Sequence, residues 1–264
     1  MTDLPAAPAA PAALREVAVH DPAVPRMELA EWASRYGLVA GITTRGHGFS
    51  LGLWSDETVG QVMSRWRAVG ATVRARFPGM VLAHQVHATT VQWHRAALDG
   101  WLIVDGVDGH ATGAPGLLLT VTVADCIPVY LAVPQKQVIA LLHAGWRGTA
   151  GGILERGVEL VKRMALVQSH DIVMHCGVGI CGECYEVGSE VLGQFSGRAE
   201  TGPGHVDLRA VLAHQGQTLG LGGITLSPWC SAHDREHFFS HRASRGRDGR
   251  MIAYAGLPAT RASR

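Results

Sequence analysis

Two histidines and a cysteine, set far apart in the chain, are the residues whose types could bind one transition-metal ion. Cys126 ends the string TVADC, His143 opens HAGWRGTAGG, and His87 lies in HQVH. Imidazole nitrogen and thiolate sulfur are ligands that zinc and copper prefer. Three protein ligands leave one coordination position open, which is typical of a catalytic zinc site. The pattern predicts an enzyme with a metal centre, although no short-range metal motif links the three residues.

The same residue types allow two other interpretations. Cys126 could be a nucleophile with His143 as its base, as in cysteine hydrolases. A metal-bound thiolate serves poorly as a nucleophile, so alkylation of Cys126 in metal-loaded protein separates these two chemistries. A non-catalytic, metal-stabilised binding module is the third hypothesis, but a purely structural site normally has four ligands.

Strand-like segments are expected to position the first histidine. Residues 80–86 and 89–93 are rich in β-branched and apolar side chains, so His84 and His87 are predicted to lie on or beside a strand. Side chains alternate between the two faces of a strand, and residues three apart therefore point in opposite directions. We expect one metal ligand here, not two.

The other two candidate ligands lie among apolar runs of strand length. Residues 117–123 and 127–133 flank Cys126, and residues 138–142 end just before His143. The segment 145–148 is predicted to turn from this strand into a helix of about 18 residues that starts near Thr149 and carries apolar residues at helical spacing. These patterns imply a buried, sheet-rich core. Further predictions are helices over 28–35, 57–76 and 208–219, and strands over 39–44, 172–174 and 224–227.

Composition excludes several classes of function. The 264 residues carry 23 basic and 22 acidic side chains, for a net charge of +1, so nothing global favours nucleic acid. The apolar runs are too short to cross a bilayer as helices. Residues 1–26 are predicted to be a flexible Pro- and Ala-rich tail without signal-peptide features, which predicts a cytoplasmic protein. Residues 27–264 are predicted to form a single catalytic domain.

The five cysteines are odd in number and widely spread, so we expect reduced thiols. Cys181 and Cys184 form a C-x-x-C that could be a redox pair or half of a second zinc site. No second C-x-x-C accompanies it, so ordinary buried or loop thiols are expected. His233 and His237 lie four residues apart without the glutamate of an H-E-x-x-H motif, which favours a solvated turn.

The strings around the three candidate ligands resemble one known family. QVH at 85–87, TVADC at 122–126 and HAGWRG at 143–148 are similar to the laccase-domain family, also called purine nucleoside phosphorylase or polyphenol oxidase proteins. Other strings extend the resemblance over nearly the whole chain after residue 26. They are TTR with Ser50, VDG around Asp108, GVGICGECYEV from Gly177, DLR at Asp207, Cys230, FFSHR, and GRM ending at Met251.

The resemblance implies a fold, a metal set and an activity. It implies a single four-layer α/β/β/α domain with mixed sheets, and His87, Cys126 and His143 as ligands of Zn²⁺, with Cu²⁺ as the alternative. The implied reaction is phosphorolysis of adenosine, inosine, guanosine and methylthioadenosine, accompanied by adenosine deamination. A copper-dependent polyphenol oxidase is the alternative, which a lack of His-x-His pairs among the 14 histidines disfavours.

Charged residues near the matching strings are the candidates for the remaining roles. Phosphorolysis needs donors for phosphate and stabilisation of charge on the departing purine. Deamination also needs a proton shuttle. The candidate substrate-binding residues are Arg45, Ser50, Arg65, Arg147 and Arg242, and the candidate catalytic residues are Asp108, Asp125 and Arg147. The segment 46–53 is shorter than the family pattern, which leaves the preferred nucleoside and the oligomeric state open.

Overall fold

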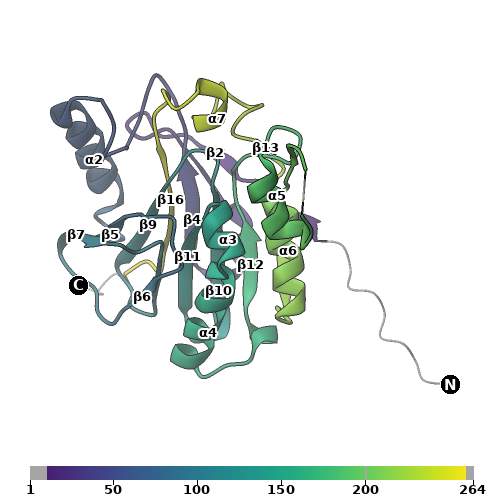
Figure 1. Ribbon diagram of the computed structural model, residues 1–264. Helices are drawn as coiled ribbons and strands as arrows, with labels where there is room; N and C mark the ends of the chain where they lie inside the picture. Colours follow the sequence, from purple (N-terminus) through teal and green to yellow (C-terminus); the bar gives the residue numbers. More distant parts are fainter. Residues whose placement is uncertain (1–10, 200, 260–264) are drawn as a thin grey trace.

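The computed structural model describes residues 11–199 and 201–259, in which two seven-stranded sheets pack face to face (Figure 1). In spatial order, the first sheet contains β1 (Ala12–Ala13), β15 (Gly223–Leu226), β12 (Val173–Cys176), β10 (Ile127–Val133), β11 (Val138–Ala144), β8 (Gly109–Thr112) and β6 (Val91–His94). The second contains β2 (Val17–Val19), β3 (Arg26–Glu28), β4 (Val39–Thr43), β16 (Met251–Gly256), β9 (Leu117–Val123), β5 (Gly79–His84) and β7 (Gly100–Asp105). Both sheets mix parallel and antiparallel pairs.

The central strands are apolar throughout because both of their faces are covered. In β10, Val129 and Leu131 pack on the helix side, whereas Tyr130 and Ala132 pack between the sheets. The Tyr130 hydroxyl donates to the carbonyl of Gly41 in the opposite sheet at 2.8 Å. Side-chain alternation along a strand with two buried faces thus accounts for the uninterrupted apolar runs in the sequence.

Helices form the two outer layers (Figure 1). On the second sheet, α2 (Val59–Val73) buries one apolar face that includes Trp66. On the first sheet, α4 (Ile153–Ala165) and α6 (Leu208–Thr218) complete a second core. The four-layer α/β/β/α arrangement with mixed sheets is therefore confirmed. The shorter elements are α1 (Ala30–Tyr36), α3 (Trp146–Ala150), α5 (Ser189–Ser196), α7 (His241–Ser244), β13 (Glu186–Val187), β14 (Gly204–His205), η1 (Pro134–Lys136) and η2 (Ser169–Asp171).

The helix expected after residue 149 differs from the prediction. It is split into α3 and α4 at Gly151 and Gly152. Gly152 has a φ of 84°, a left-handed backbone conformation that interrupts a right-handed helix. The preceding strand extends two residues beyond the predicted end, so His143 lies within β11. Several elements have no counterpart among the sequence predictions: β1, β2, β3, β7, β8, β13, β14, β16, α5, α7, η1 and η2.

The N-terminal segment joins the sheets where the structure describes it. β1 pairs with β15, and β2 pairs with β3. Between them, Glu16 is 1% exposed and accepts hydrogen bonds from His175 Nε2 at 3.1 Å and from Ser227 Oγ at 2.7 Å. Residues 11–26 of the segment predicted as a flexible tail are thus held by strand pairing and a buried carboxylate, and residues 1–10 lie outside the described residues. Among the described residues, no helix has both the length and the apolar character needed to cross a membrane.

Candidate metal centre and its cavity

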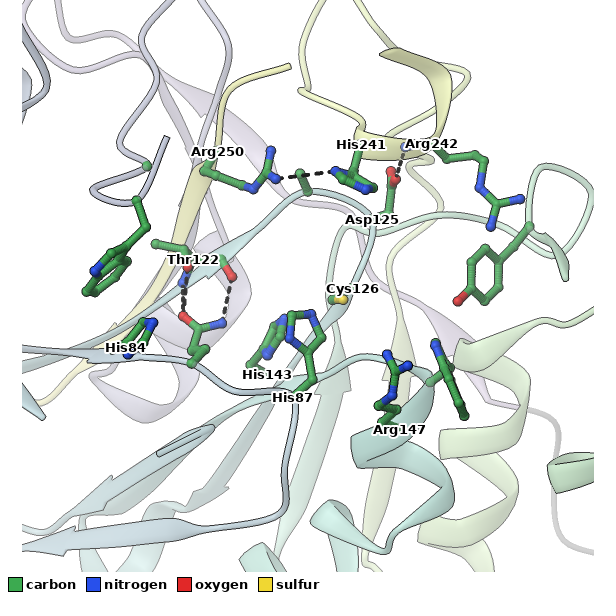
Figure 2. Close-up of a pocket in the computed structure, with 16 residues that line it drawn as sticks. His84, His87, Thr122, Asp125, Cys126, His143, Arg147, His241, Arg242 and Arg250 are labelled. Atoms are coloured by element: carbon green, nitrogen blue, oxygen red, sulfur yellow. Dashed lines mark hydrogen bonds between the residues drawn. The ribbon is translucent and has the colours of Figure 1, made fainter. Parts of the chain in front are cut away.

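His87, Cys126 and His143 come together although they belong to three separate segments. Their potential ligand atoms all lie within 4.8 Å of one another. Strand pairing explains the meeting of two of them, because Ile127 of β10 is in register with Ala144 of β11, and this places Cys126 beside the end of β11. His87 reaches the same point from the loop after β5 (Figure 2). The predicted ligand set is brought together by the fold.

Asp108 forms hydrogen bonds with two of the three candidate ligands, His87 and His143. Its carboxylate accepts backbone N–H groups of Val86 (3.2 Å), His87 (2.9 Å) and Ala88 (2.8 Å). These bonds fix His87 at a φ of 58°, a backbone conformation that non-glycine residues rarely adopt outside constrained sites. Asp108 also accepts from Nδ1 of His143 at 2.9 Å, which leaves Nε2 of His143 free for a metal.

The charges around Cys126 favour its thiolate. Burial alone raises the pKa of Cys126, but His143 and His87 beside the sulfur lower the pKa to about 6. Burial likewise opposes protonation of His143, whereas Cys126 and Asp108 raise the pKa of His143 to about 9. The metal-free pocket therefore holds a thiolate next to an imidazolium at neutral pH. A thiolate is the form in which cysteine binds metals, and it is also the form that acts as a nucleophile.

Gly145 gives the backbone the close approach that this cluster requires. A Cβ atom at this position would lie 2.9 Å from Cys126 Sγ and 3.1 Å from His87 Cδ2. Both distances are shorter than ordinary van der Waals contact, so a side chain here would displace the ligand atoms. The glycine in the string HAGWRG is thus explained by crowding against two candidate ligands.

The cluster opens into a cavity of about 440 Å³ (Figure 2). Three guanidinium groups line it, from Arg147, Arg242 and Arg250, together with the carboxylate of Asp125. Among the described residues that line the cavity, positive charge therefore exceeds negative charge. Such a lining suits an anionic group of a ligand, because guanidinium binds phosphate and carboxylate oxygens in a fork geometry.

Asp125 connects the metal-ligand loop to the opposite wall. It precedes Cys126 and has a φ of 89°, and its carboxylate accepts from Ser231 Oγ and from the backbone N–H of Arg242, each at 2.6 Å. The guanidinium of Arg242 lies 5.1 Å from the centre of the Tyr185 ring and donates to the carbonyl of Glu186. Two chain segments distant in sequence thus form one wall of the cavity.

Three candidate substrate-binding residues do not line this cavity: Arg45, Ser50 and Arg65. Arg45 pairs with Asp248 at 3.4 Å, and Arg65 pairs with Glu57 at 2.6 Å. Ser50 is 3% exposed, and its Oγ accepts from the backbone N–H of Arg250. Arg147, Arg242 and Asp125 do line the cavity, whereas Asp108 is fully buried behind the ligands.

Other residues of the cavity were not singled out from the sequence. Arg250 donates to His241 Nδ1 at 3.3 Å, and both line the cavity. The ring of Trp54 lies against that of His84, with centres 4.7 Å apart. His84 therefore shares the cavity with His87, but it belongs to neither group of potential metal ligands among the described residues. Tyr185 and Trp146 add further aromatic surface.

The two packed mixed sheets and the cavity with its candidate metal centre agree with an α/β enzyme of the laccase-like class. The chain belongs to the family described as multi-copper polyphenol oxidoreductase laccase, whose model matches residues 39–258.

Relatives and solved structures agree with this family. The chain is 32% identical to "Purine nucleoside phosphorylase YlmD" of Geobacillus stearothermophilus over 247 residues, covering 83% of this chain and 90% of the relative. It is 33% identical to "Adenosine deaminase RL5" from an unknown prokaryotic organism over 178 residues, covering 61% and 64%. The crystal structure of YlmD from Geobacillus stearothermophilus superposes with a TM-score of 0.80 at 27% identity, covering 91% of this chain and 98% of that one.

Proposed function

We propose that this protein is a zinc-dependent purine nucleoside phosphorylase with an accompanying adenosine deaminase activity. Its substrates are adenosine, inosine, guanosine and methylthioadenosine, with phosphate as the second substrate. The observation that carries the proposal is the His87–Cys126–His143 cluster at the base of a cavity lined by three arginines. Similar proteins are named purine nucleoside phosphorylase and adenosine deaminase, which supports both activities.

The donor set fits Zn²⁺. It offers two imidazoles and a cysteine whose pKa is lowered, and the Asp108 bond to His143 Nδ1 directs Nε2 to the metal. When bound, the ion supplies a Lewis-acidic centre with one open coordination position. His87, Cys126 and His143 would hold it, and Asp108 is proposed as a positioning residue rather than a proton shuttle, because its carboxylate is buried and already accepts four hydrogen bonds.

The arginines are assigned to phosphate. In phosphorolysis a phosphate oxygen forms a bond to ribose C1′, the bond from C1′ to the purine nitrogen breaks, and its electron pair leaves with the base. Arg147, Arg242 and Arg250 would orient the attacking phosphate and offset its charge. Asp125, which faces the cavity, is the proposed proton-transfer residue, and the rings of Trp54 and Tyr185 offer surfaces for the purine.

A product assay tests the proposal. Metal-analysed protein is incubated with adenosine, with and without phosphate, and the products are separated. We expect adenine and ribose 1-phosphate only when phosphate is present, and inosine also in its absence. Zinc-loaded protein that forms neither adenine nor inosine would contradict the proposal and favour the binding-module hypothesis.

Replacing Arg147 by glutamine is expected to raise the KM for phosphate about 10- to 100-fold, because a charge-assisted hydrogen bond contributes about 1.5–3 kcal/mol. Arg147 stacks over the ring of Trp146, 4.4 Å from its centre, and is not a candidate metal ligand, so the metal content should not change. The matched control is Arg163→Gln in α4, an exposed arginine that does not line the cavity. Steady-state kinetics at varied phosphate measures the effect. An unchanged phosphate KM would remove Arg147 from the phosphate site.

Copper oxidase chemistry is the second candidate, because two nitrogens and one sulfur also suit copper and the family description names it. Multicopper oxidases add a histidine-rich cluster to such a site. Among the described residues, the other group of potential ligands is three cysteines and one histidine. If the protein as purified consumes oxygen with a phenol as substrate, the oxidase is favoured. If oxygen is consumed only after copper is added, the oxidase reaction is an activity of the added metal.

A further inference from the structure

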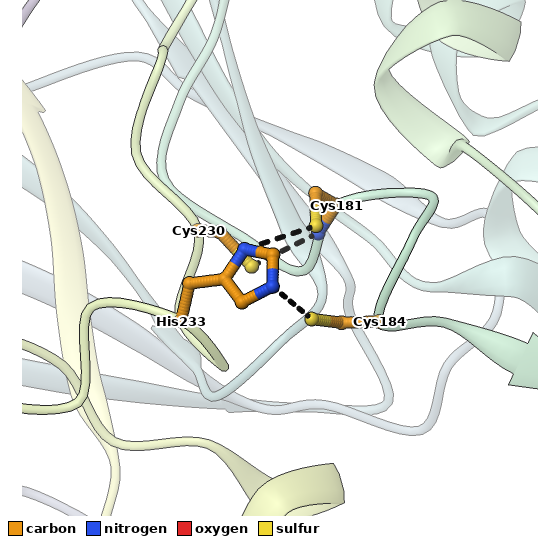
Figure 3. Close-up of side chains that lie close together, drawn as sticks. All are labelled: Cys181, Cys184, Cys230 and His233. Carbon is orange, nitrogen blue, oxygen red and sulfur yellow. Dashed lines mark hydrogen bonds between the residues drawn. The ribbon is translucent and has the colours of Figure 1, made fainter.

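Three cysteines and a histidine outside the cavity turn their side chains toward one another (Figure 3). Cys181 and Cys184 come from the loop after β12, and Cys230 and His233 come from the loop after β15. One potential ligand atom from each residue lies within 4.8 Å of the others. All five cysteines of the chain are free thiols. Cys126 belongs to the cavity, Cys176 to the core, and the other three to this cluster.

We propose that Cys181, Cys184, Cys230 and His233 form a second, structural Zn²⁺ site. Four ligands of the type Cys₃His are a closed tetrahedral set, which structural zinc prefers and which leaves no position for a substrate. The four residues form two short motifs, C-x-x-C at 181–184 and C-x-x-H at 230–233. Binding of one Zn²⁺ displaces the three thiol protons and requires no oxidant or reductant.

The distances within the cluster are close to those of a zinc site. Cys184 Sγ lies 3.1 Å from Nε2 of His233, and Cys181 Sγ lies 3.7 Å from Nδ1 of the same ring. With bonds of about 2.3 Å to sulfur and about 2.0 Å to nitrogen, ligand atoms of tetrahedral zinc are separated by about 3.5–3.8 Å. The two sulfur atoms approach different nitrogens of the ring, so binding of one ion requires His233 to present a single nitrogen to the three sulfurs.

Hydrogen bonds from backbone N–H groups stabilise the two loops and connect them to each other. The N–H of Cys181 donates to Cys230 Sγ at 3.3 Å, and the N–H of Cys184 donates to the carbonyl of Cys181 at 3.2 Å. The N–H of Cys230 donates to the carboxylate of Asp234 at 2.9 Å. The bond from Cys181 N–H to Cys230 Sγ favours the thiolate of Cys230 and orients its sulfur, and the other two bonds stabilise the loops themselves.

A zinc ion at this second site would stabilise one wall of the cavity at the first site. The first loop leads directly into Tyr185, and the second leads to α7, which carries His241 and Arg242. Between the two loops, Ser231 N–H donates to the carbonyl of Gly179 at 3.0 Å, and Ser231 Oγ donates to Asp125. A zinc ion here would therefore hold together the two segments that place Tyr185 and Arg242 beside the metal centre.

Metal stoichiometry separates the two sites and does not depend on the nucleoside activity. Each protein is expressed with zinc in the medium and analysed by elemental and native mass spectrometry. We expect two equivalents of zinc in the parent protein, one in Cys126→Ala, one in Cys184→Ser and none in the double variant. Cys176→Ala is the matched control, because this core cysteine belongs to neither cluster, and it should keep both equivalents.

A second measurement covers the case in which Cys184→Ser fails to fold. Cys126→Ala protein is loaded with Co²⁺ in place of zinc, and its absorption spectrum is recorded. We expect tetrahedral cobalt bands with intense thiolate charge transfer, reduced but not abolished in His233→Ala, and a lower melting temperature after chelation. Cys126→Ala protein that binds neither zinc nor cobalt, or that contains a Cys181–Cys184 disulfide when purified in air, would overturn the proposal.

Discussion

Replacing Cys126 by alanine is expected to abolish the proposed metal binding in the cavity and to slow both proposed nucleoside reactions by at least about 10³-fold, which corresponds to about 4 kcal/mol of transition-state stabilisation. The variant loses the single sulfur ligand and leaves two imidazoles, of which His143 no longer faces a thiolate. Because Cys126 lies at the cavity and an alanine keeps its Cβ atom, the fold should persist. Elemental analysis and the adenosine assay measure the two effects.

Alkylation separates the metal interpretation from the nucleophile interpretation of the same residue. The lowered pKa of Cys126, about 6, makes it a thiolate at neutral pH in the metal-free protein, and iodoacetamide should modify it rapidly. Metal binding should protect it. Rapid alkylation of Cys126 in metal-loaded protein, with loss of activity, would contradict the metal interpretation and favour a cysteine hydrolase. Cys176→Ala serves as the control for general effects of removing a thiol.

The buried strands could be predicted from the sequence because both faces of the central strands are covered, and this leaves long apolar runs in β9, β10 and β11. The strands β7, β8 and β16 are different. β7 has several exposed or half-buried side chains, so its pattern carries no clear periodicity. β8 has only four residues, and β8 and β16, although buried, both contain glycine and alanine, which give weak strand signals.

Strand alternation, which predicts one metal ligand rather than two among His84 and His87, holds only in part. β5 ends at His84, and the chain then turns, so strand alternation does not extend to His87. The bonds from Asp108, not strand geometry, direct His87 to the cluster. Both histidines consequently face one cavity, which a local rule could not foresee.

The cavity wall was harder to predict, because several loops distant in sequence converge there. Arg45 and Arg65 resemble phosphate-binding residues in type, but each is engaged by a neighbouring carboxylate, of Asp248 and Glu57 respectively. Arg250 takes part in the cavity through the pairing of β16 with β9. The Cys₃His cluster carried a usable signal, because C-x-x-H at 230–233 complements C-x-x-C at 181–184.

Replacing Asp108 by alanine is expected to lower the free energy of unfolding by about 3–5 kcal/mol and to weaken metal binding about 10- to 100-fold. The carboxylate is 0% exposed, and its loss leaves the N–H groups that hold His87 without an acceptor. His143 also loses the partner of its Nδ1, so its tautomer is no longer fixed. Denaturant titration and metal-competition assays measure the two quantities.

Asp105 offers a matched control for this prediction, because it makes the same kind of bond at the surface. Its side chain is 89% exposed and pairs with His84 Nδ1 at 2.8 Å, whereas the Asp108–His143 pair is 0% and 3% exposed. Asp105→Ala should change the free energy of unfolding by at most about 0.5 kcal/mol and leave metal binding intact, since exposed pairs are screened by water. Equal losses of unfolding free energy in Asp105→Ala and Asp108→Ala would show that burial does not explain the contribution of Asp108. Normal metal affinity in Asp108→Ala would show that Asp108 does not orient His143 and His87 for the metal.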